Sequence, residues 1–350
     1  MRTELFSPPR LRSAEEERDR RVTWFELFFD LVFVLAVAAL SRNLQHDHSA
    51  AGFVGFAGLA VPVWWSWVIY IFYADRFDTD DVVYRLAVMV GMLFVAGMAA
   101  SLRTALHGGA DAFVGCYLVV RAVPALLYLR AARYVPLARR LARNFGSGSL
   151  AAACLWLSSL AVSPPLRYLF WAGAVAIELA LPLIVRRTVA ATPMHVSHLG
   201  ERFGLFTIIV LGEAVVSVGA SVSRVTWQPA TVATAACAFA LAGALWWIYF
   251  DFGSDRVAEA GFWRTQIYVF GHLPIILSVT SIAAGASLAI RQAGASSLAL
   301  AIRVALCGGV ALYLCAISVV ALSEPQLAGW ARSSRLAAAA AAAERKPPTR

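Results

Sequence analysis

The stretch WFELFFDLVFVLAVAALSRNL, residues 24–44, decides the fold class because it is apolar over almost its whole length. At a rise of about 1.5 Å per residue, a helix of about 20 residues crosses a hydrocarbon core of about 30 Å. Its two acidic residues, Glu26 and Asp30, lie four positions apart near the start and therefore share a helical face. This stretch predicts a membrane-spanning helix with one acidic face at its first end.

The whole chain has a membrane composition. Of its 350 residues, 60% are apolar and 15% are charged, and the mean hydropathy is +0.69, whereas soluble domains carry roughly 25% charged residues. Long apolar runs predict about ten spans, the fifth of which is the shortest: 24–44, 51–73, 82–104, 111–130, 149–163, 166–186, 201–222, 229–250, 265–290 and 296–322. We expect an all-α polytopic integral membrane protein, which excludes a soluble enzyme.

Arginine placement predicts the orientation, because positive residues are retained on the cytoplasmic side. The predicted inner segments carry clusters of arginine, whereas each predicted outer loop carries one: Arg42, Arg103, Arg167, Arg224 and Arg291. We therefore expect both termini in the cytoplasm, with residues 1–21 and 323–350 as tails. The net charge of +9 fits inner loops beside anionic lipid headgroups and requires no nucleic acid partner.

An internal repeat is visible in the second half of the chain. Trp64-Trp65, Ile69-Tyr70 and Asp75-Arg76 reappear in the same order as Trp246-Trp247, Ile248-Tyr249 and Asp255-Arg256. Six predicted spans separate the copies, and an even number restores the starting side, so the repeats are predicted to be parallel. The first would cover residues 22–187 with about six helices, and the second would cover 188–322 with about four and is incomplete.

Four ionisable residues are predicted to lie inside the hydrocarbon, where each costs at least about 2.5–3.5 kcal/mol at a helix centre. Arg121, Glu178 and Glu213 fall near the midplane, and His272 precedes a helix-kinking proline. Arg121 could pair with Glu178 or Glu213 merely to neutralise charge. Alternatively they form a functional polar site, because one arginine cannot balance two glutamates and the second carboxylate would be protonated, bind a cation or contact water.

The acidic face of the first span has two interpretations as well. Glu26 and Asp30 could be interfacial residues near water, at a helix N-terminus that stabilises negative charge, or they could form an ion entry. The tryptophans of both repeats are interpreted as an aromatic belt or as packing residues.

Two further polar segments raise the question of metal binding. His195, His198 and Glu201 recur every three residues, a spacing that could offer zinc ligands, but the His-Glu-x-x-His pattern is absent. We predict an interfacial hydrogen-bonded cluster with Glu201 and Arg202 capping the seventh span. The inner loop containing Asp75, Arg76 and Asp78 lacks the glycine and glutamate of a calcium loop and is predicted to form salt bridges through Arg76 and Arg85. No metal and no cofactor is predicted.

Several motifs resemble one bacterial family. TWFELFFDLVFV (23–34), RFDTDD (76–81), HLGERFGL (198–205) with LGE (211–213), and HLP (272–274) resemble the low temperature requirement protein A family over about residues 22–322. The resemblance implies a multi-pass protein of the bacterial inner membrane, named for a growth phenotype in the cold, and supplies no substrate. More loosely, FDLVF (29–33) is similar to the Phe-Ser-Asp motif of certain six-span-repeat potassium channels, without its serine, and the second repeat has Phe206-Thr207 instead.

These patterns favour a transporter or channel for an ion or small solute, with Glu213, Glu178, Arg121 and His272 at a midplane site and Asp30 as a further candidate. One alternative is a membrane-embedded enzyme acting on a lipid or lipid-linked substrate with His195, His198 and Glu201 near the headgroups. Another is a structural or sensory membrane protein linked to cold growth. The expected partners are the lipid bilayer, an unknown ion or solute, and a possible second copy of the chain.

Overall fold

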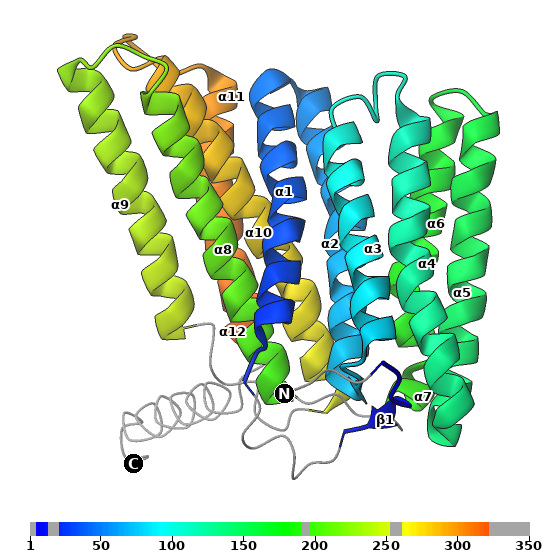
Figure 1. The fold of residues 1–350 in the computed structure, drawn as a ribbon. Helices are drawn as coiled ribbons and strands as arrows, with labels where there is room; N and C mark the ends of the chain where they lie inside the picture. Colours follow the sequence, from blue (N-terminus) through cyan, green and yellow to red (C-terminus); the bar gives the residue numbers. More distant parts are fainter. Residues whose placement is uncertain (1–4, 13–20, 191–195, 253–260, 322–350) are drawn as a thin grey trace, which may run out of the picture.

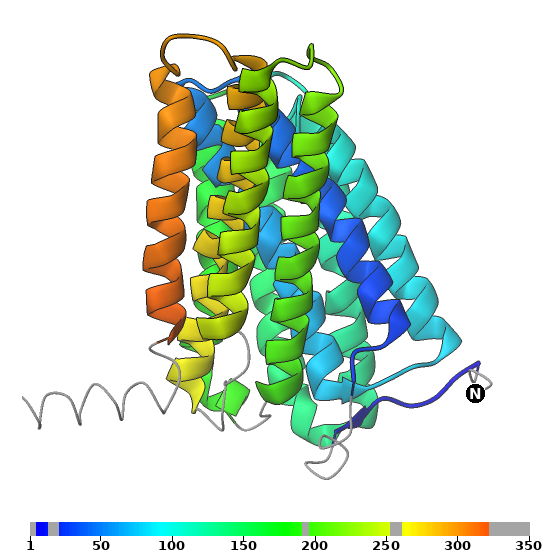
Figure 2. The same cartoon turned by 90° about the vertical axis from the view of Figure 1, so that its left-hand side faces the viewer.

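The protein is a bundle of near-parallel helices (Figures 1 and 2) in a computed structural model that describes residues 5–12, 21–190, 196–252 and 261–321. The first helices are α1 (Trp24–His46), α2 (Ala50–Arg76), α3 (Val82–Ser101), α4 (Ala110–Tyr134), α5 (Arg139–Ser158), α6 (Leu166–Ile184) and α7 (Arg186–Ala190). They are followed by α8 (Val196–Val222), α9 (Pro229–Phe252), α10 (Phe262–Arg291), α11 (Leu300–Arg303) and α12 (Gly309–Ala321). A π-helical turn, Val304–Gly308, joins α11 to α12, and short 3-10 turns, Pro136–Ala138 and Ser159–Ala161, flank α5.

The expected all-α polytopic fold class is confirmed. Within the described residues, nine helices are long and apolar enough to cross a membrane: α1, α2, α3, α4, α6, α8, α9, α10 and the continuous stretch Leu300–Ala321. A tenth long helix, α5, corresponds to the expected fifth span. Its first five residues include Arg139, Arg140 and Arg143, so it is not apolar enough to be counted with the other nine. Figure 1 nevertheless shows α5 running beside α4 and α6 over much of the bundle height.

Two predicted boundaries were wrong. The fifth span was expected at 149–163 but α5 covers Arg139–Ser158, because long arginine side chains at a helix end can extend to the membrane surface and leave their helix in place. The seventh span was expected from residue 201, but α8 begins at Val196. Glu201 and Arg202 therefore lie in the second turn of α8 and do not cap it.

Helix starts at the arginine-rich end are fixed by side-chain caps. At α1, the Thr23 hydroxyl accepts a hydrogen bond from the backbone N–H of Glu26 at 3.2 Å, and the Glu26 carboxylate accepts one from the N–H of Thr23 at 2.9 Å. At α3, Asp81 accepts a hydrogen bond from the N–H of Tyr84 at 2.8 Å. Each cap satisfies a backbone donor that the helix leaves free.

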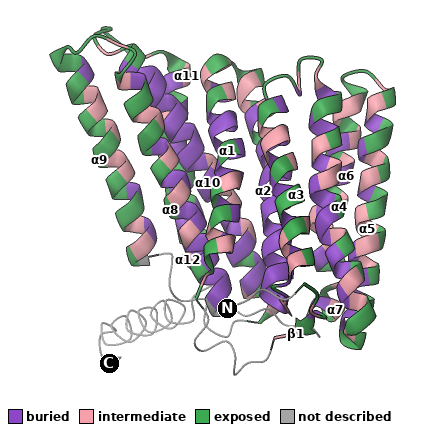
Figure 3. Cartoon of the chain, viewed as in Figure 1, coloured by how far each residue is buried: buried purple, intermediate pink, exposed green. Residues whose placement is uncertain are grey.

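The core lies around α2 and α10. The most apolar part of α10 is 83% buried and that of α2 is 72% buried, against 11% for α9, and Figure 3 shows the same contrast. Both central helices are apolar on all sides, as expected of helices surrounded by protein. Trp65 of α2 stacks on Phe270 of α10 with ring centroids 5.8 Å apart, so these two helices pack directly through aromatic rings.

The packing order is similar in the two predicted repeats. In the first, α1 packs on α2 and α3, and α3 packs on α4; in the second, α8 packs on α9 and α10, and α10 packs on α12. The α10–α12 contact is close, because a Cβ atom added at Gly309 would lie 2.7 Å from the Ile282 side chain. The predicted repeats, about six helices in residues 22–187 and about four in 188–322, stay a prediction.

The segment before α1 binds to the bundle. Strand β1 (Arg10–Leu11) pairs antiparallel with β2 (Phe77–Asp78) in the loop after α2. Arg10 and Arg12 contact the Asp78 carboxylate at 2.7 and 3.2 Å. Of the salt bridges predicted for this loop, the one through Arg85 is present, with Asp80 at 2.8 Å. Asp78 therefore holds part of the predicted tail against the arginine-rich end.

Candidate functional site

Arg202 of α8 joins two carboxylates of α1. Its guanidinium contacts the Asp30 carboxylate at 2.6 Å and the Glu26 carboxylate at 3.1 Å. Asp30 is 0% exposed and Arg202 is 1% exposed. The interpretation of Asp30 as an interfacial residue near water is therefore wrong, because α8 and α2 cover the acidic face of α1.

Trp67 of α2 supplies a second donor to Asp30. Its indole N–H donates to Asp30 Oδ1 at 2.8 Å, and the indole is held by stacking on Phe206 at 4.2 Å and by an edge contact with Phe203 at 4.8 Å. Both donors use Oδ1, and Asp30 Oδ2 has no hydrogen-bond partner among the described residues. A buried carboxylate oxygen without a donor is costly and needs an explanation.

His198 of α8 extends the site to α2. His198 Nδ1 lies 3.3 Å from Asp75 Oδ1, and Nε2 lies 3.7 Å from Glu26 Oε1. Asp75 is 0% exposed and His198 is 2% exposed. We call this set, Glu26, Asp30, Asp75, His198 and Arg202, the inner charge cluster.

The inner charge cluster connects the two predicted repeats, because α1 and α2 belong to the first and α8 to the second. Moving a charged group from water into a protein interior costs several kcal/mol per ion and is offset only by good pairing. The cluster brings together three carboxylates, one arginine and one histidine. The cluster therefore holds more acidic than basic groups at the contact between α1, α2 and α8.

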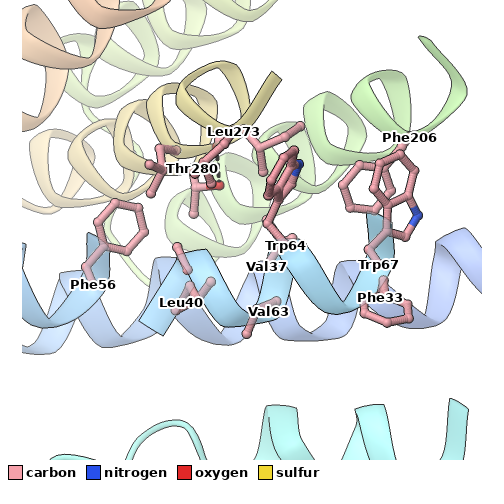
Figure 4. A pocket seen from close by; sticks show the side chains of 13 residues that line it. Phe33, Val37, Leu40, Phe56, Val63, Trp64, Trp67, Phe206, Leu273 and Thr280 are labelled. Carbon is pink, nitrogen blue, oxygen red and sulfur yellow. Dashed lines mark hydrogen bonds between the residues drawn. The ribbon is translucent and has the colours of Figure 1, made fainter. Parts of the chain in front are cut away.

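An apolar column continues from the cluster along the same helices. Side chains of α1, α2, α8 and α10 enclose a cavity of about 10 Å³ (Figure 4), lined by Phe33, Val37, Leu40, Phe56, Ala60, Val63, Trp64, Trp67, Phe206, Leu273, Ile276, Leu277 and Thr280. Trp67 belongs both to this lining and to the cluster, and Phe33 lies three residues beyond Asp30. A cavity of this volume has room for about one water molecule, so the column is closed.

A second buried ion pair lies between α4 and α6. Arg121 Nε donates to Glu178 Oε1 at 3.1 Å, and the Tyr117 hydroxyl donates to Glu178 Oε2 at 2.6 Å. Both carboxylate oxygens are thus satisfied, while Arg121 Nη1 has no hydrogen-bond partner among the described residues. The geometry shows one of the two pairings expected for Arg121.

Glu213 and His272 lie apart from this pair. Glu213 accepts a hydrogen bond from Ser217, one turn on in α8, at 3.3 Å. His272 contacts the Tyr249 hydroxyl at 2.9 Å and the Tyr268 carbonyl oxygen at 2.7 Å. In the described structure the four predicted midplane residues therefore do not meet in one cluster. The position of each residue along its helix sets its depth in the membrane. The side chains are nevertheless separated, because they lie on helix faces that point in different directions.

The predicted headgroup-facing histidine cluster is not formed by the described side chains. His198 turns inward to Asp75, Glu201 accepts the N–H of Val22 at 3.4 Å, and His195 lies outside the described residues. Arg76 donates to the Phe72 carbonyl at 3.0 Å. In the described parts of the chain, no group of three His, Cys, Asp or Glu residues is placed to hold a metal ion.

Sequence reasoning missed the aromatic donors. Trp67 and Tyr117 hold Asp30 and Glu178, and the Tyr249 hydroxyl contacts His272. The available signal was chemical, because an indole N–H or phenol O–H in a membrane span needs a hydrogen-bond partner. Trp67 and Tyr117 could therefore have been predicted as hydrogen-bond donors to carboxylates buried on other spans.

Outside the spans, Asp81 fastens the N-terminal segment. Its carboxylate is bound by the Arg130 guanidinium and accepts the N–H groups of Ser7 at 2.9 Å and Tyr84 at 2.8 Å. Burial alone would raise the pKa of Asp81, but these hydrogen bonds outweigh it and hold the pKa below its ordinary value. Asp81 is therefore ionised at neutral pH and links residues 5–12 to α3 and α4.

Comparison with known proteins agrees with the membrane architecture. The sequence pattern of the bacterial low temperature requirement A protein (LtrA) family matches residues 21–345. The chain is 28% identical over 290 residues to the uncharacterized protein RA0937 of Rhizobium meliloti (strain 1021), an alignment covering 77% of this chain and 70% of that protein. No solved structure matches the chain. The chain therefore belongs to the bacterial low temperature requirement A family, as its motifs predicted.

Proposed function

We propose that this protein moves a small cation across the membrane along the seam between α1, α2, α8 and α10. The observation that carries the proposal is Asp30. Its carboxylate is fully buried, it is held by Arg202 and Trp67, and one of its oxygens has no hydrogen-bond partner among the described residues. An ionisable residue buried in a membrane bundle is by default a candidate for an ion pathway.

The charges favour a cation as the transported species. Glu26, Asp30 and Asp75 concentrate negative potential at one end of the seam, and acidic groups of this kind select cations in channels. Arg202 occupies the position between two of them. A cation approaching Asp30 Oδ2 would compete with Arg202 for the carboxylate, which couples cation binding to the contact between α1 and α8.

The apolar column supplies the closed gate of this proposal. Its cavity of about 10 Å³ is too small for a hydrated ion, and apolar constrictions block conduction by excluding water. Trp67 touches Asp30 through its N–H and Phe206 through its ring. A change in the pairing of Asp30 would therefore release the first aromatic side chain of the column.

Two sequence features also support a cation site at Asp30. Asp30 is the acidic residue in the FDLVF stretch that is similar to the potassium-channel motif. Arginines cluster in the loops at the end where α1 begins, which favours a cytoplasmic location for that end and for the inner charge cluster in a bacterial inner membrane. The cluster would then face the cation-rich cytoplasm.

The test is cation flux through the full chain in liposomes. Potassium, sodium and proton fluxes are measured under an imposed gradient for the wild type, Asp30→Asn and Asp111→Asn. Asp111 is an exposed carboxylate at the start of α4, so it controls for the chemical change alone. We expect wild-type flux of at least one cation, a fall of about tenfold or more in Asp30→Asn, equivalent to about 1.4 kcal/mol in the barrier, and unchanged flux in Asp111→Asn.

Other outcomes contradict the proposal in different ways. Absence of flux for all three cations in the wild type would remove it and favour a structural or sensory role. Flux that falls in Glu213→Gln but not in Asp30→Asn would move the site to Glu213, one of the four residues of the midplane site predicted from the sequence. Melting of each variant in detergent shows whether a lost flux reflects a lost fold.

A further inference from the structure

A large cavity lies between α2 and α6, away from the inner charge cluster. Its volume is about 1170 Å³, and it is walled by the first half of α2, the first half of α6, Trp156 of α5, and the loops that follow α1 and α3. These loops lie at the end of the bundle opposite the start of α1 (Figure 1). The cavity is thus at the other membrane surface from the cluster.

Small residues leave this space open. Gly55 and Gly58 of α2 and Ala172 and Ala176 of α6 are near or on its walls. A Cβ atom added at Gly58 would meet no other atom within 4 Å. Facing small residues usually allow two helices to pack closely, but here these residues line the cavity, and α2 and α6 contact each other elsewhere.

The depth of the cavity corresponds to one membrane leaflet. Its lining extends into α2 as far as Pro62 and into α6 as far as Leu179, and Leu179 lies 13 residues after the start of α6 at Leu166. At about 1.5 Å per residue that distance is about 20 Å. Half of a bilayer, including its headgroup region, is also about 20 Å.

The lining changes from polar to apolar along this depth. At the loop end it includes Arg103, His107, His46 and Asn43, together with Asp47, whose pKa is held below its ordinary value by hydrogen bonds from Ser49. Deeper, the walls are the aliphatic and aromatic side chains of α2 and α6.

We infer that this cavity binds one glycerophospholipid of the leaflet at the α1–α2 loop end, with an acyl chain between α2 and α6 and the phosphate beside Arg103. The depth matches an acyl chain that reaches the midplane, and the cationic side chain lies at headgroup level, where basic residues attract phosphate. A small polar solute would leave most of this apolar wall unmatched.

The experiment is photolabelling of the full chain in lipid nanodiscs that contain a phosphatidylglycerol with a diazirine near the end of one acyl chain. Cross-linked peptides are then identified by mass spectrometry. We expect labels on residues 58–62 of α2 and 175–179 of α6, because these residues line the deep part of the cavity. Labels spread evenly over all lipid-facing helices would overturn the inference.

Filling the cavity supplies the matched comparison. Gly58→Leu places a side chain in the open space, and Gly115→Leu makes the same change on α4, where an added Cβ is also free of neighbours and the residue is exposed outside the cavity. Labelling of α2 and α6 should fall about tenfold in Gly58→Leu, a change of about 1.4 kcal/mol, and stay unchanged in Gly115→Leu. If Gly58→Leu fails to fold, Ala176→Leu replaces it.

The headgroup assignment has its own measurement. Arg103→Gln should lower labelling by the phospholipid about fivefold, the effect of about one basic charge near the headgroups. A photoactivatable fatty acid serves as the second probe. Specific labelling by the fatty acid with none by the phospholipid would overturn the assignment to a bilayer lipid. These measurements read binding and do not depend on cation flux.

Discussion

The molecule buries two arginine–carboxylate pairs of similar chemistry in different settings. Between α4 and α6, Arg121 and Tyr117 satisfy both oxygens of Glu178. Between α1 and α8, Arg202 serves two carboxylates, and Asp30 keeps one oxygen without a partner among the described residues. The first pair is saturated on its acidic side and lies within one predicted repeat, whereas the second has excess acid and joins both repeats. From this difference we propose a structural role for the first pair and the cation site for the second.

The largest expected effect is on stability at the inner charge cluster. Arg202→Ala leaves Glu26 and Asp30 buried without their shared cation and should destabilise the protein by about 3–5 kcal/mol. Thermal unfolding in detergent measures this. Arg202→Ala combined with Asp30→Asn should recover part of the loss, and a double variant as unstable as Arg202→Ala would show that charge is not the cause.

The saturated pair should be replaceable by apolar side chains. The triple variant Tyr117→Phe, Arg121→Met and Glu178→Met removes the guanidinium, the carboxylate and the phenol hydroxyl together, and apolar replacement of a whole buried ion pair is often neutral or stabilising. We expect unfolding within about 1 kcal/mol of wild type and full cation flux. Loss of flux in a stable triple variant would show that the α4–α6 pair has a role in transport. It would contradict the proposed difference between the two pairs.

The two aromatic donors should separate stability from function. Trp67→Phe and Tyr117→Phe each remove a hydrogen bond to a buried carboxylate and should each cost about 1.5–3 kcal/mol. Only Trp67 also lines the apolar column, so only Trp67→Phe should change cation flux. Equal flux in the two variants, measured in liposomes beside their melting temperatures, would argue against a gate at Trp67.

The smallest effect at neutral pH concerns Asp81. Its lowered pKa means that the ionised carboxylate stabilises the folded state above the ordinary aspartate pKa of about 3.9, and that this contribution is lost as the pH falls through the lower folded-state value. The protection factors of the amides in residues 5–12, which remove the intrinsic pH dependence of exchange, should therefore stay constant from about pH 5 to 8 and fall under more acidic conditions. Asp81→Asn should show low protection at every pH, while Asp80→Asn, at an exposed residue, should behave as wild type.

Sequence alone was sufficient for the architecture, because hydrocarbon thickness sets the length of an apolar run. It also named Glu178 and Glu213 as the two possible partners of Arg121, since all three lie at similar depth. The fifth span was misplaced because three arginines at the start of α5 hide the helix from a hydropathy reading. The family assignment came from short motifs such as TWFELFFDLVFV, whose polar residues occupy the inner charge cluster.

The sequence predicted several residues of the candidate site but not how they are arranged. Depth along a helix follows from residue number, but azimuth depends on how helices pack, so Glu213 and His272 were grouped with residues that they do not contact. The same limit hid Trp67, because an indole at a span can equally belong to an aromatic belt. The cavity beside Gly58 was not predicted either, since small residues in a span indicate close packing as readily as open space.

The most direct test of the account compares Asp30→Asn with Glu178→Gln in the same liposome preparation. Both changes neutralise one buried carboxylate that is paired with an arginine. The contrast between the two pairs predicts that cation flux is lost in Asp30→Asn and retained in Glu178→Gln at equal amounts of folded protein. Flux retained in Asp30→Asn and lost in Glu178→Gln would contradict it.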